Sequence, residues 1–182
     1  MHPSPRALRA CLFFLSLFAG LAGPSGRADI AAVPPDWPAN VRLIPARLGT
    51  EPFTSFRLVL PQFRLYDSRG WRLAKSSGYE RNEFRGRLEA LLAGQGTADG
   101  ERRLSADLSR YETPGGRRLK EVPPADFTVI EYWAEWCPPC HVQTGELAEV
   151  LGNHPQLSVN VVYVYASPRG WVMRKVRPAE GR

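Results

Sequence analysis

Two short stretches in the first half of the chain alternate between apolar and polar residues. Residues 63–66 (Phe-Arg-Leu-Tyr) and 71–75 (Trp-Arg-Leu-Ala-Lys) flank a turn sequence that ends at Gly70. Alternation with a period of two around a glycine turn predicts a β-hairpin. Residues 80–92 repeat apolar positions at helical spacing, and Gly94 follows as a helix end, so we expect a helix there. Its apolar positions are Phe84, Leu88, Leu91 and Leu92.

The second half of the chain has the pattern strand, helix, strand. Residues 127–133 (Phe-Thr-Val-Ile-Glu-Tyr-Trp) and 157–165 are apolar and rich in β-forming residues, which is typical of buried strands. Residues 141–151 between them carry apolar side chains along one helical side. A βαβ unit with short links places its two strands in parallel. Residues 94–103 predict a loop, and residues 104–111 fit either a helix or a strand.

The first 28 residues have the pattern of a secretory signal peptide. Arg6 and Arg9 precede an apolar run over residues 10–23, and the small residues Gly26 and Ala28 follow it. The alternative is an uncleaved membrane anchor, but this run of 14 residues is shorter than the ~20 that a spanning helix needs. We therefore expect an exported, periplasmic protein whose signal peptide is cleaved.

These patterns divide the 182-residue chain into four segments. Residues 1–28 are the signal peptide, and residues 29–55 are a proline-rich, extended lead-in. Residues 56–103 hold a short candidate strand at 56–60, the hairpin and the first helix. Residues 104–182 hold the βαβ half. The overall prediction is an α/β fold.

The net charge gives little support for a nucleic-acid partner. The formal charge of +6 falls to +3 once the predicted signal peptide, with three arginines and no acidic residue, is removed. The remainder contains no block of five or more like charges, so we expect no nucleic-acid binding.

The candidate chemistry lies in the only two cysteines that remain after the signal peptide, Cys137 and Cys140. Exported proteins can form disulfides, but a bridge across two residues constrains the unfolded chain too little to be a useful structural link. The motif follows a strand and opens a helix, where the helix dipole favours a thiolate at Cys137. Cys140 lies on the same helix face and can close a disulfide.

Two other interpretations of the cysteine pair stay open at this point. The pair could be an inert bridge, or half of a metal site. The chain has no second Cys-x-x-Cys for a zinc site of four cysteines, but His141 and His154 could complete a copper site with Cys137 and Cys140.

Residues 129–140 (Val-Ile-Glu-Tyr-Trp-Ala-Glu-Trp-Cys-Pro-Pro-Cys) resemble the active-site strand and motif of thioredoxins. The Cys-Pro-Pro-Cys sequence is similar to that of exported TlpA-like disulfide reductases, and the resemblance covers roughly residues 104–165. It implies a thioredoxin-like fold and a thiol–disulfide oxidoreductase, a reductase rather than an oxidase. The expected partners are protein disulfides or dithiols and a membrane-bound electron donor. No bound cofactor is expected, because the cysteine pair is itself the redox group.

The resemblance also implies roles for individual residues. Cys137 would be the nucleophile and Cys140 the resolving thiol, while Trp136 would shape the substrate-binding surface around the sulfur. Glu131 matches the buried acid that helps to move the proton of the resolving cysteine; the alternative is an exposed acid at a strand edge. Trp133 is expected to pack in the core.

The chain departs from the TlpA-like pattern at two positions in the helix. Gln143 stands where many of these reductases carry a glutamate, and Gly145 replaces a proline that bends the helix. Proton transfer would therefore depend on Glu131, if on any carboxylate.

A larger departure concerns the order of the elements. Only 17 residues follow Tyr165, too few for the second half of a thioredoxin fold. Residues 60–71, with the helix at 80–92, look like that half, so we hypothesise a permuted fold. Pro61 would then be the cis-proline that contacts substrate beside Cys137. The rival hypotheses are an incomplete fold behind an unrelated hairpin and a truncated chain.

Two further functions remain as alternatives. The chain could be a thioredoxin-like binding protein that has kept the motif and lost turnover. It could also be a copper-handling protein that uses the two thiols of the motif.

Overall fold

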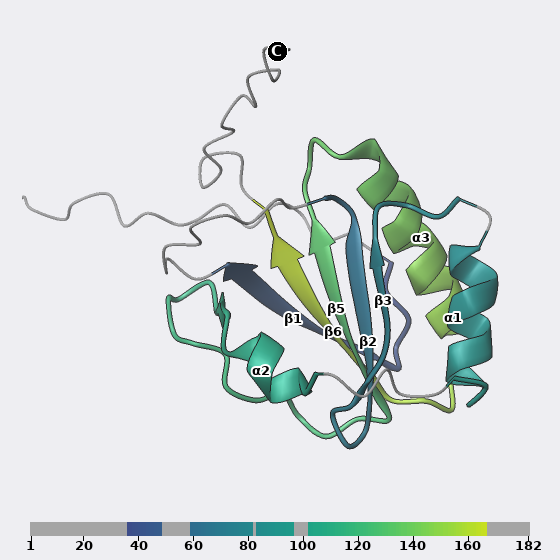
Figure 1. The fold of residues 1–182 in the computed structure, drawn as a ribbon, viewed down its shortest axis with the longest axis horizontal. Helices are drawn as coiled ribbons and strands as arrows, with labels where there is room; N and C mark the ends of the chain where they lie inside the picture. The colour runs from purple at the N-terminus through teal and green to yellow at the C-terminus, as the bar shows by residue number, and fades with distance from the viewer. Residues whose placement is uncertain (1–35, 49–58, 82, 97–101, 167–182) are drawn as a thin grey trace, which may run out of the picture.

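The computed structural model describes residues 36–48, 59–81, 83–96 and 102–166. These residues form one six-stranded sheet with helices on both faces, so the mixed α/β class is confirmed (Figure 1). Within the described ranges, no helix is long and apolar enough to cross a membrane. The predicted signal peptide lies outside the described residues. The elements are β1 (Val41–Leu48), β2 (Gln62–Asp67), β3 (Arg72–Ser77), α1 (Phe84–Leu92), α2 (Leu104–Leu108), β4 (Tyr111–Glu112), β5 (Phe127–Trp133), α3 (Pro138–Gly152) and β6 (Val159–Tyr165).

The strands follow the order β3-β2-β5-β6-β1-β4 across the sheet. β5 and β6 pair in parallel with Phe127 opposite Val159, as the βαβ pattern predicts. The hairpin β2–β3 is also confirmed, and β2 pairs antiparallel with β5. The sheet is therefore mixed, and β5 lies between one antiparallel and one parallel neighbour.

The helices divide between the two faces of the sheet. α1 and α3 cover one face, which we call the disulfide face, and the short α2 covers the opposite face (Figure 1). α1 begins at Phe84, four residues later than the predicted start at position 80. The four buried residues of α1 are the four apolar positions that defined its periodicity. Residues 104–111, which were ambiguous, form α2 and the first residue of β4.

The proline-rich lead-in is not simply extended, because its described part contains a strand. β1 pairs in parallel with β6 from Val41 to Arg47. Proline is unfavourable in a strand with neighbours on both sides, because it has no backbone N–H to donate. At Pro45, β1 has β6 on one side only, since β4 pairs with β1 only at Arg47 and Leu48. In the short strand predicted at residues 56–60, Val59 and Leu60 have no strand structure, and the other three residues lie outside the described ranges.

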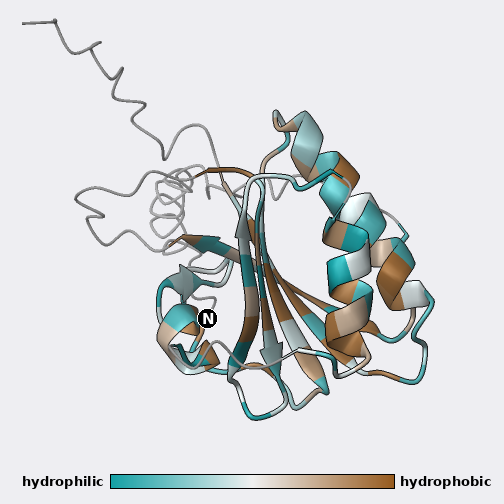
Figure 2. Cartoon of the chain, turned by 45° about the vertical axis from the view of Figure 1, so that its right-hand side comes forward, coloured by the Kyte–Doolittle hydropathy of each residue, from teal (hydrophilic) through white to brown (hydrophobic). Residues whose placement is uncertain are grey.

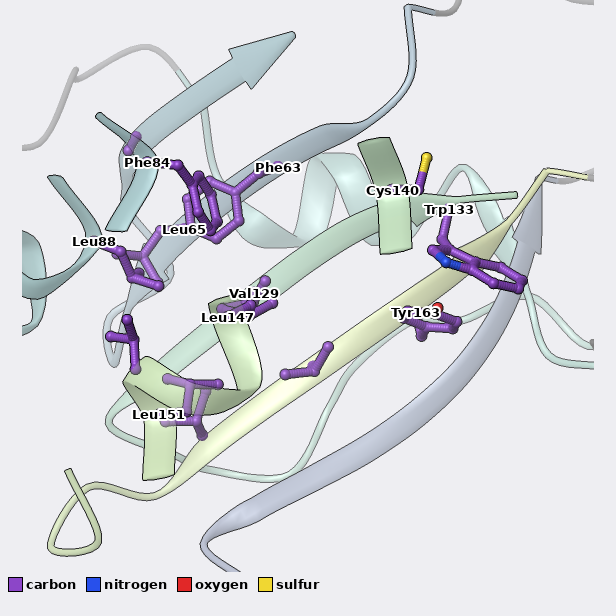
Figure 3. Close-up of a cluster of buried hydrophobic side chains, with 14 of the residues drawn as sticks. Phe63, Leu65, Phe84, Leu88, Val129, Trp133, Cys140, Leu147, Leu151 and Tyr163 are labelled. Carbon is purple, nitrogen blue, oxygen red and sulfur yellow. The ribbon is translucent and has the colours of Figure 1, made fainter. Parts of the chain in front are cut away.

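Each face of the sheet has its own hydrophobic core. Side chains of α1, α3 and alternate sheet positions fill the core of the disulfide face (Figure 3), where Cys140 lies beside Trp133. The opposite core contains Tyr66, Leu108 and Tyr111. Apolar residues accordingly gather on the strands and on the inward sides of the helices (Figure 2).

The Leu60–Pro61 peptide bond is cis, as the hypothesis of a permuted fold requires. Pro61 immediately precedes β2, whose first residue, Gln62, pairs with Tyr132 near the end of β5. From that end of β5 the chain continues to Cys137. Pro61 therefore lies at the edge of the sheet where the cysteine motif begins.

Candidate active site at the Cys137–Cys140 disulfide

The two cysteines form a disulfide at the first turn of α3. Their Cα atoms are 5.3 Å apart. Cys137 is the N-cap residue, with extended backbone, and its Sγ accepts a hydrogen bond of 3.3 Å from the Cys140 N–H. The intervening prolines occupy the first helical positions, where a missing N–H costs nothing. The predicted position of Cys137 at a helix N-terminus is thus confirmed.

This position makes the two sulfurs chemically unequal. The unpaired N–H groups and the dipole of α3 favour negative charge at Cys137, which makes its thiolate the better nucleophile and leaving group. Cys137 is 5% exposed, whereas Cys140 is fully buried in the core of the disulfide face. A substrate sulfur can therefore approach Cys137 more easily than Cys140.

The residues next to the two cysteines in the chain are exposed. Trp136, directly before Cys137, is 54% exposed. Pro138 and Pro139 are also exposed, and Val142 lies further along the same helix. A large apolar side chain that is exposed to solvent next to a reactive sulfur is suited to contact a partner polypeptide. A role for Trp136 in substrate binding stays a prediction.

Glu131 lies on β5 beneath α3 and is fully buried. Since β5 is flanked by β2 and β6, the alternative of an exposed strand-edge acid is wrong. Thr144 Oγ1 donates a hydrogen bond of 2.8 Å to Glu131 Oε1. Burial raises the pKa of Glu131 to about 8, although Thr144 and Gln143 act in the opposite direction. Thr144 follows Cys140 by one helical turn, so this carboxyl lies one turn along α3 from the resolving thiol.

Trp133 packs in the core, as expected, with 2% of its surface exposed. Its ring contacts Tyr163 and His141, with centroid distances of 5.5 Å and 5.2 Å. The His141 ring also hydrogen-bonds through Nε2 to the carbonyl of Glu135 at 2.9 Å. His141 is thereby fixed against the loop that leads from β5 to the motif.

The histidines do not complete a copper site with the cysteines. His154 follows the C-terminal end of the 15-residue α3, roughly 20 Å from its first turn. In the described parts of the chain, no group of three His, Cys, Asp or Glu side chains is placed to hold a metal ion.

Sequence reasoning missed two residues of this site, Thr144 and Tyr163. Thr144 could have been found from its spacing of four residues after Cys140, which places it on the same helix face. Tyr163 pairs directly with Glu131 across the parallel strands. Finding it required the strand register, which the sequence pattern does not fix to a single residue.

No protein-family model, no curated protein and no solved structure matches this chain.

Proposed function

We propose that this chain is a thiol–disulfide oxidoreductase that exchanges disulfides with protein substrates through Cys137 and Cys140. The observation that carries the proposal is the disulfide at the N-terminus of α3, which joins a slightly exposed sulfur to a fully buried one. Buried Glu131, with its raised pKa, supports the same conclusion, because perturbed acids gather at sites of proton transfer.

The sheet supports a permuted thioredoxin-like fold as the scaffold. A thioredoxin-like fold combines a βαβ unit with a ββα unit, and β5-α3-β6 and β2-β3-α1 are two such units. They combine in the strand order β3-β2-β5-β6, with both helices on the disulfide face. The ββα unit comes first in the chain, which is the permuted order. We infer the fold from this arrangement and from the cysteine motif.

The exchange reaction has two steps. In the first, the Cys137 thiolate attacks a substrate disulfide, forms a mixed disulfide and releases one substrate thiolate. In the second, Cys140 attacks Cys137, closes the Cys137–Cys140 bond and releases the second substrate sulfur. The substrate gains two electrons, and the enzyme is left as the disulfide.

We propose the reductase direction and an exported, periplasmic location. A reductase must recover two electrons after each turnover, so this direction requires an electron donor, which we assign to a membrane-bound partner. The support for direction and location comes from the Cys-Pro-Pro-Cys resemblance and from the pattern of the first 28 residues.

Trapping of the mixed disulfide tests the function. We expect Cys140→Ser to accumulate a covalent adduct with a disulfide-containing protein, because the resolving thiol is absent. Cys137→Ser should form no such adduct, and its exchange rate should fall to the uncatalysed background. The measurement is non-reducing electrophoresis followed by mass spectrometry of the linked peptides. Equal adduct formation by both variants would contradict the assigned roles, and no adduct with either would contradict the function.

A further inference from the structure

Four polar side chains are buried together between β5, β6 and the first half of α3. They are Glu131, Gln143, Thr144 and Tyr163, and none is more than 2% exposed. Glu131 Oε2 and the Tyr163 hydroxyl have no hydrogen-bond partner among the described residues. The amide atoms of Gln143 also lack a partner within the described ranges. Buried polar atoms are nearly always paired in folded proteins, so these unpaired atoms on neighbouring residues need an explanation.

Tyr163 is the direct neighbour of Glu131 on the adjacent strand. Both side chains lie on the face of the sheet that α3 covers, and Tyr163 lies beside Trp133 in Figure 3. Burial raises the pKa of the Tyr163 phenol, charge on Glu131 raises it further, and Thr144 lowers it. The phenol is therefore within electrostatic reach of both Glu131 and Thr144.

The other surroundings of Glu131 provide no charge. β2 presents Phe63 directly opposite Glu131, and α3 presents Thr144 and Gln143. The remaining titratable groups at this end of α3 are the two cysteines, joined as a disulfide, and His141, which contacts Trp133 and the Glu135 carbonyl. No charged side chain contributes to the pKa shift of Glu131 in the described structure. Hydroxyl and amide groups are thus the means by which its ionisation can be adjusted.

We propose that Tyr163 is a positioning residue for disulfide exchange, which acts through Thr144 to hold the Glu131 carboxyl ready for the proton of Cys140. This inference rests on the proposed function. A threonine hydroxyl can donate one hydrogen bond and accept another. When Tyr163 donates to Thr144 Oγ1, the Thr144 proton is directed to Glu131 Oε1, the bond that the structure shows.

The proton balance of the resolving step explains the need for this arrangement. The Cys140 thiol loses its proton to the Glu131 carboxylate, and its sulfur attacks Cys137. The Cys137–Cys140 bond forms, the bond between Cys137 and the substrate sulfur breaks, and the substrate leaves as a thiolate that takes a proton from water. Glu131 must be ionised to accept the proton, although burial opposes ionisation. A directed hydrogen bond from Thr144 favours the carboxylate.

The test is a titration of Glu131 that does not depend on turnover. The carboxyl ¹³C shift of Glu131 would be followed in the oxidised full chain from about pH 5 to about pH 10, with Glu131→Gln to assign the signal. The parent should titrate near 8. Tyr163→Phe, which removes only the hydroxyl, should raise the midpoint by about one pH unit, the worth of a hydrogen bond to a charged group. The midpoint in the pH dependence of the resolving rate should shift by the same amount as the Glu131 titration.

Matched variants separate this role from packing. Tyr165→Phe removes a hydroxyl from the next aromatic residue of β6 on the same face, which contacts Trp133 at 5.8 Å, and it should leave the midpoint unchanged. Thr144→Val should raise the midpoint and Thr144→Ser should not. If Tyr163→Phe does not fold, the two Thr144 variants decide the question.

An unchanged midpoint in Tyr163→Phe, or equal shifts in Tyr163→Phe and Tyr165→Phe, would overturn the inference. A shifted midpoint in a chain that shows no disulfide exchange would instead overturn the function on which the inference rests.

Discussion

The two faces of the sheet each bury one carboxylate completely, and they hold it in opposite ways. Asp107 on the opposite face and Glu131 on the disulfide face are both 0% exposed. Asp107 lies 2.8 Å from Arg64, which is itself buried, and it accepts a hydrogen bond from the Tyr66 hydroxyl. Glu131 accepts a hydrogen bond from the hydroxyl of Thr144, and no charged side chain among the described residues contributes to its pKa shift.

The opposite face extends this pairing into a network. Arg102 and Arg110 lie 3.5 Å and 3.9 Å from Asp107. The hydroxyls of Tyr111 and Tyr132 share a hydrogen bond, and Arg64 lies over the Tyr132 ring at 5.2 Å. These contacts fasten α2 to the sheet.

The comparison separates two uses of a buried acid. A carboxylate that is paired with a cation contributes to the fold and is costly to remove. A carboxylate that is buried without a cation destabilises its own ionised form, and such groups gather at sites where protons move. On this basis we assign Asp107 to stability and Glu131 to the proposed redox site.

The largest expected change in stability follows from Asp107→Asn. The variant leaves the buried Arg64 guanidinium without its counter-charge, so the free energy of unfolding should fall by about 3–5 kcal/mol. Urea denaturation measures this loss. Glu149→Gln is the control, because it breaks the exposed Arg85–Glu149 pair and should cost less than about 1 kcal/mol. Similar losses in both variants would show that the Asp107 network has no special role in stability.

Glu131→Gln should have the opposite effect, and its gain in stability over the parent should grow as the pH rises from 4.5 to about 8. The pKa of Glu131 is raised in the folded chain from 4.5 to about 8, so the unfolded chain releases this proton first as the pH rises. Folded stability is then lost between those two values, by on the order of 3–5 kcal/mol. The glutamine variant should not lose stability over this pH range, because the glutamine side chain does not ionise.

Urea midpoints at about pH 5 and about pH 9 test this difference. The glutamine variant should match the parent at the lower pH and exceed it at the higher pH. A variant that is less stable than the parent at both pH values would place Glu131 with Asp107 among the structural acids.

The smallest effect on stability is expected at Trp136, an exposed residue next to the disulfide. Trp136→Ala removes a side chain that is 54% exposed, so the free energy of unfolding should change by less than about 0.5 kcal/mol. Exchange with a protein disulfide should slow severalfold, while exchange with dithiothreitol should not. Val142→Ala is the matched control, because Val142 is an apolar side chain of α3 that is 50% exposed. Equal slowing in both variants would argue against specific contact by Trp136.

Much of this fold could be predicted from the sequence because its signals are local. Alternation defined the β2–β3 hairpin, helical spacing identified the buried side of α1, and the strand before Cys137 was predicted with its observed bounds. β1 was missed, since proline-rich composition conceals a strand whose stability comes from pairing with β6, more than a hundred residues later.

The site was predictable to the same extent. The cysteines and Trp136 follow from a contiguous motif, and Glu131 follows from its place on the preceding strand. Tyr163 depends on the register between β5 and β6. Asp107 lies in a five-residue helix whose pattern was ambiguous, and its partner Arg64 comes from the other half of the chain. Contacts between distant segments leave little trace in a single sequence.

The reduction potential of the Cys137–Cys140 pair shows whether this pair is redox-active, as we propose. The purified chain would be equilibrated with glutathione or dithiothreitol buffers, and the thiol content measured. We expect a reversible two-electron transition below about −200 mV, as for a reductase. A potential near about −120 mV would reverse the proposed direction. A folded sample with no reversible transition would contradict the account.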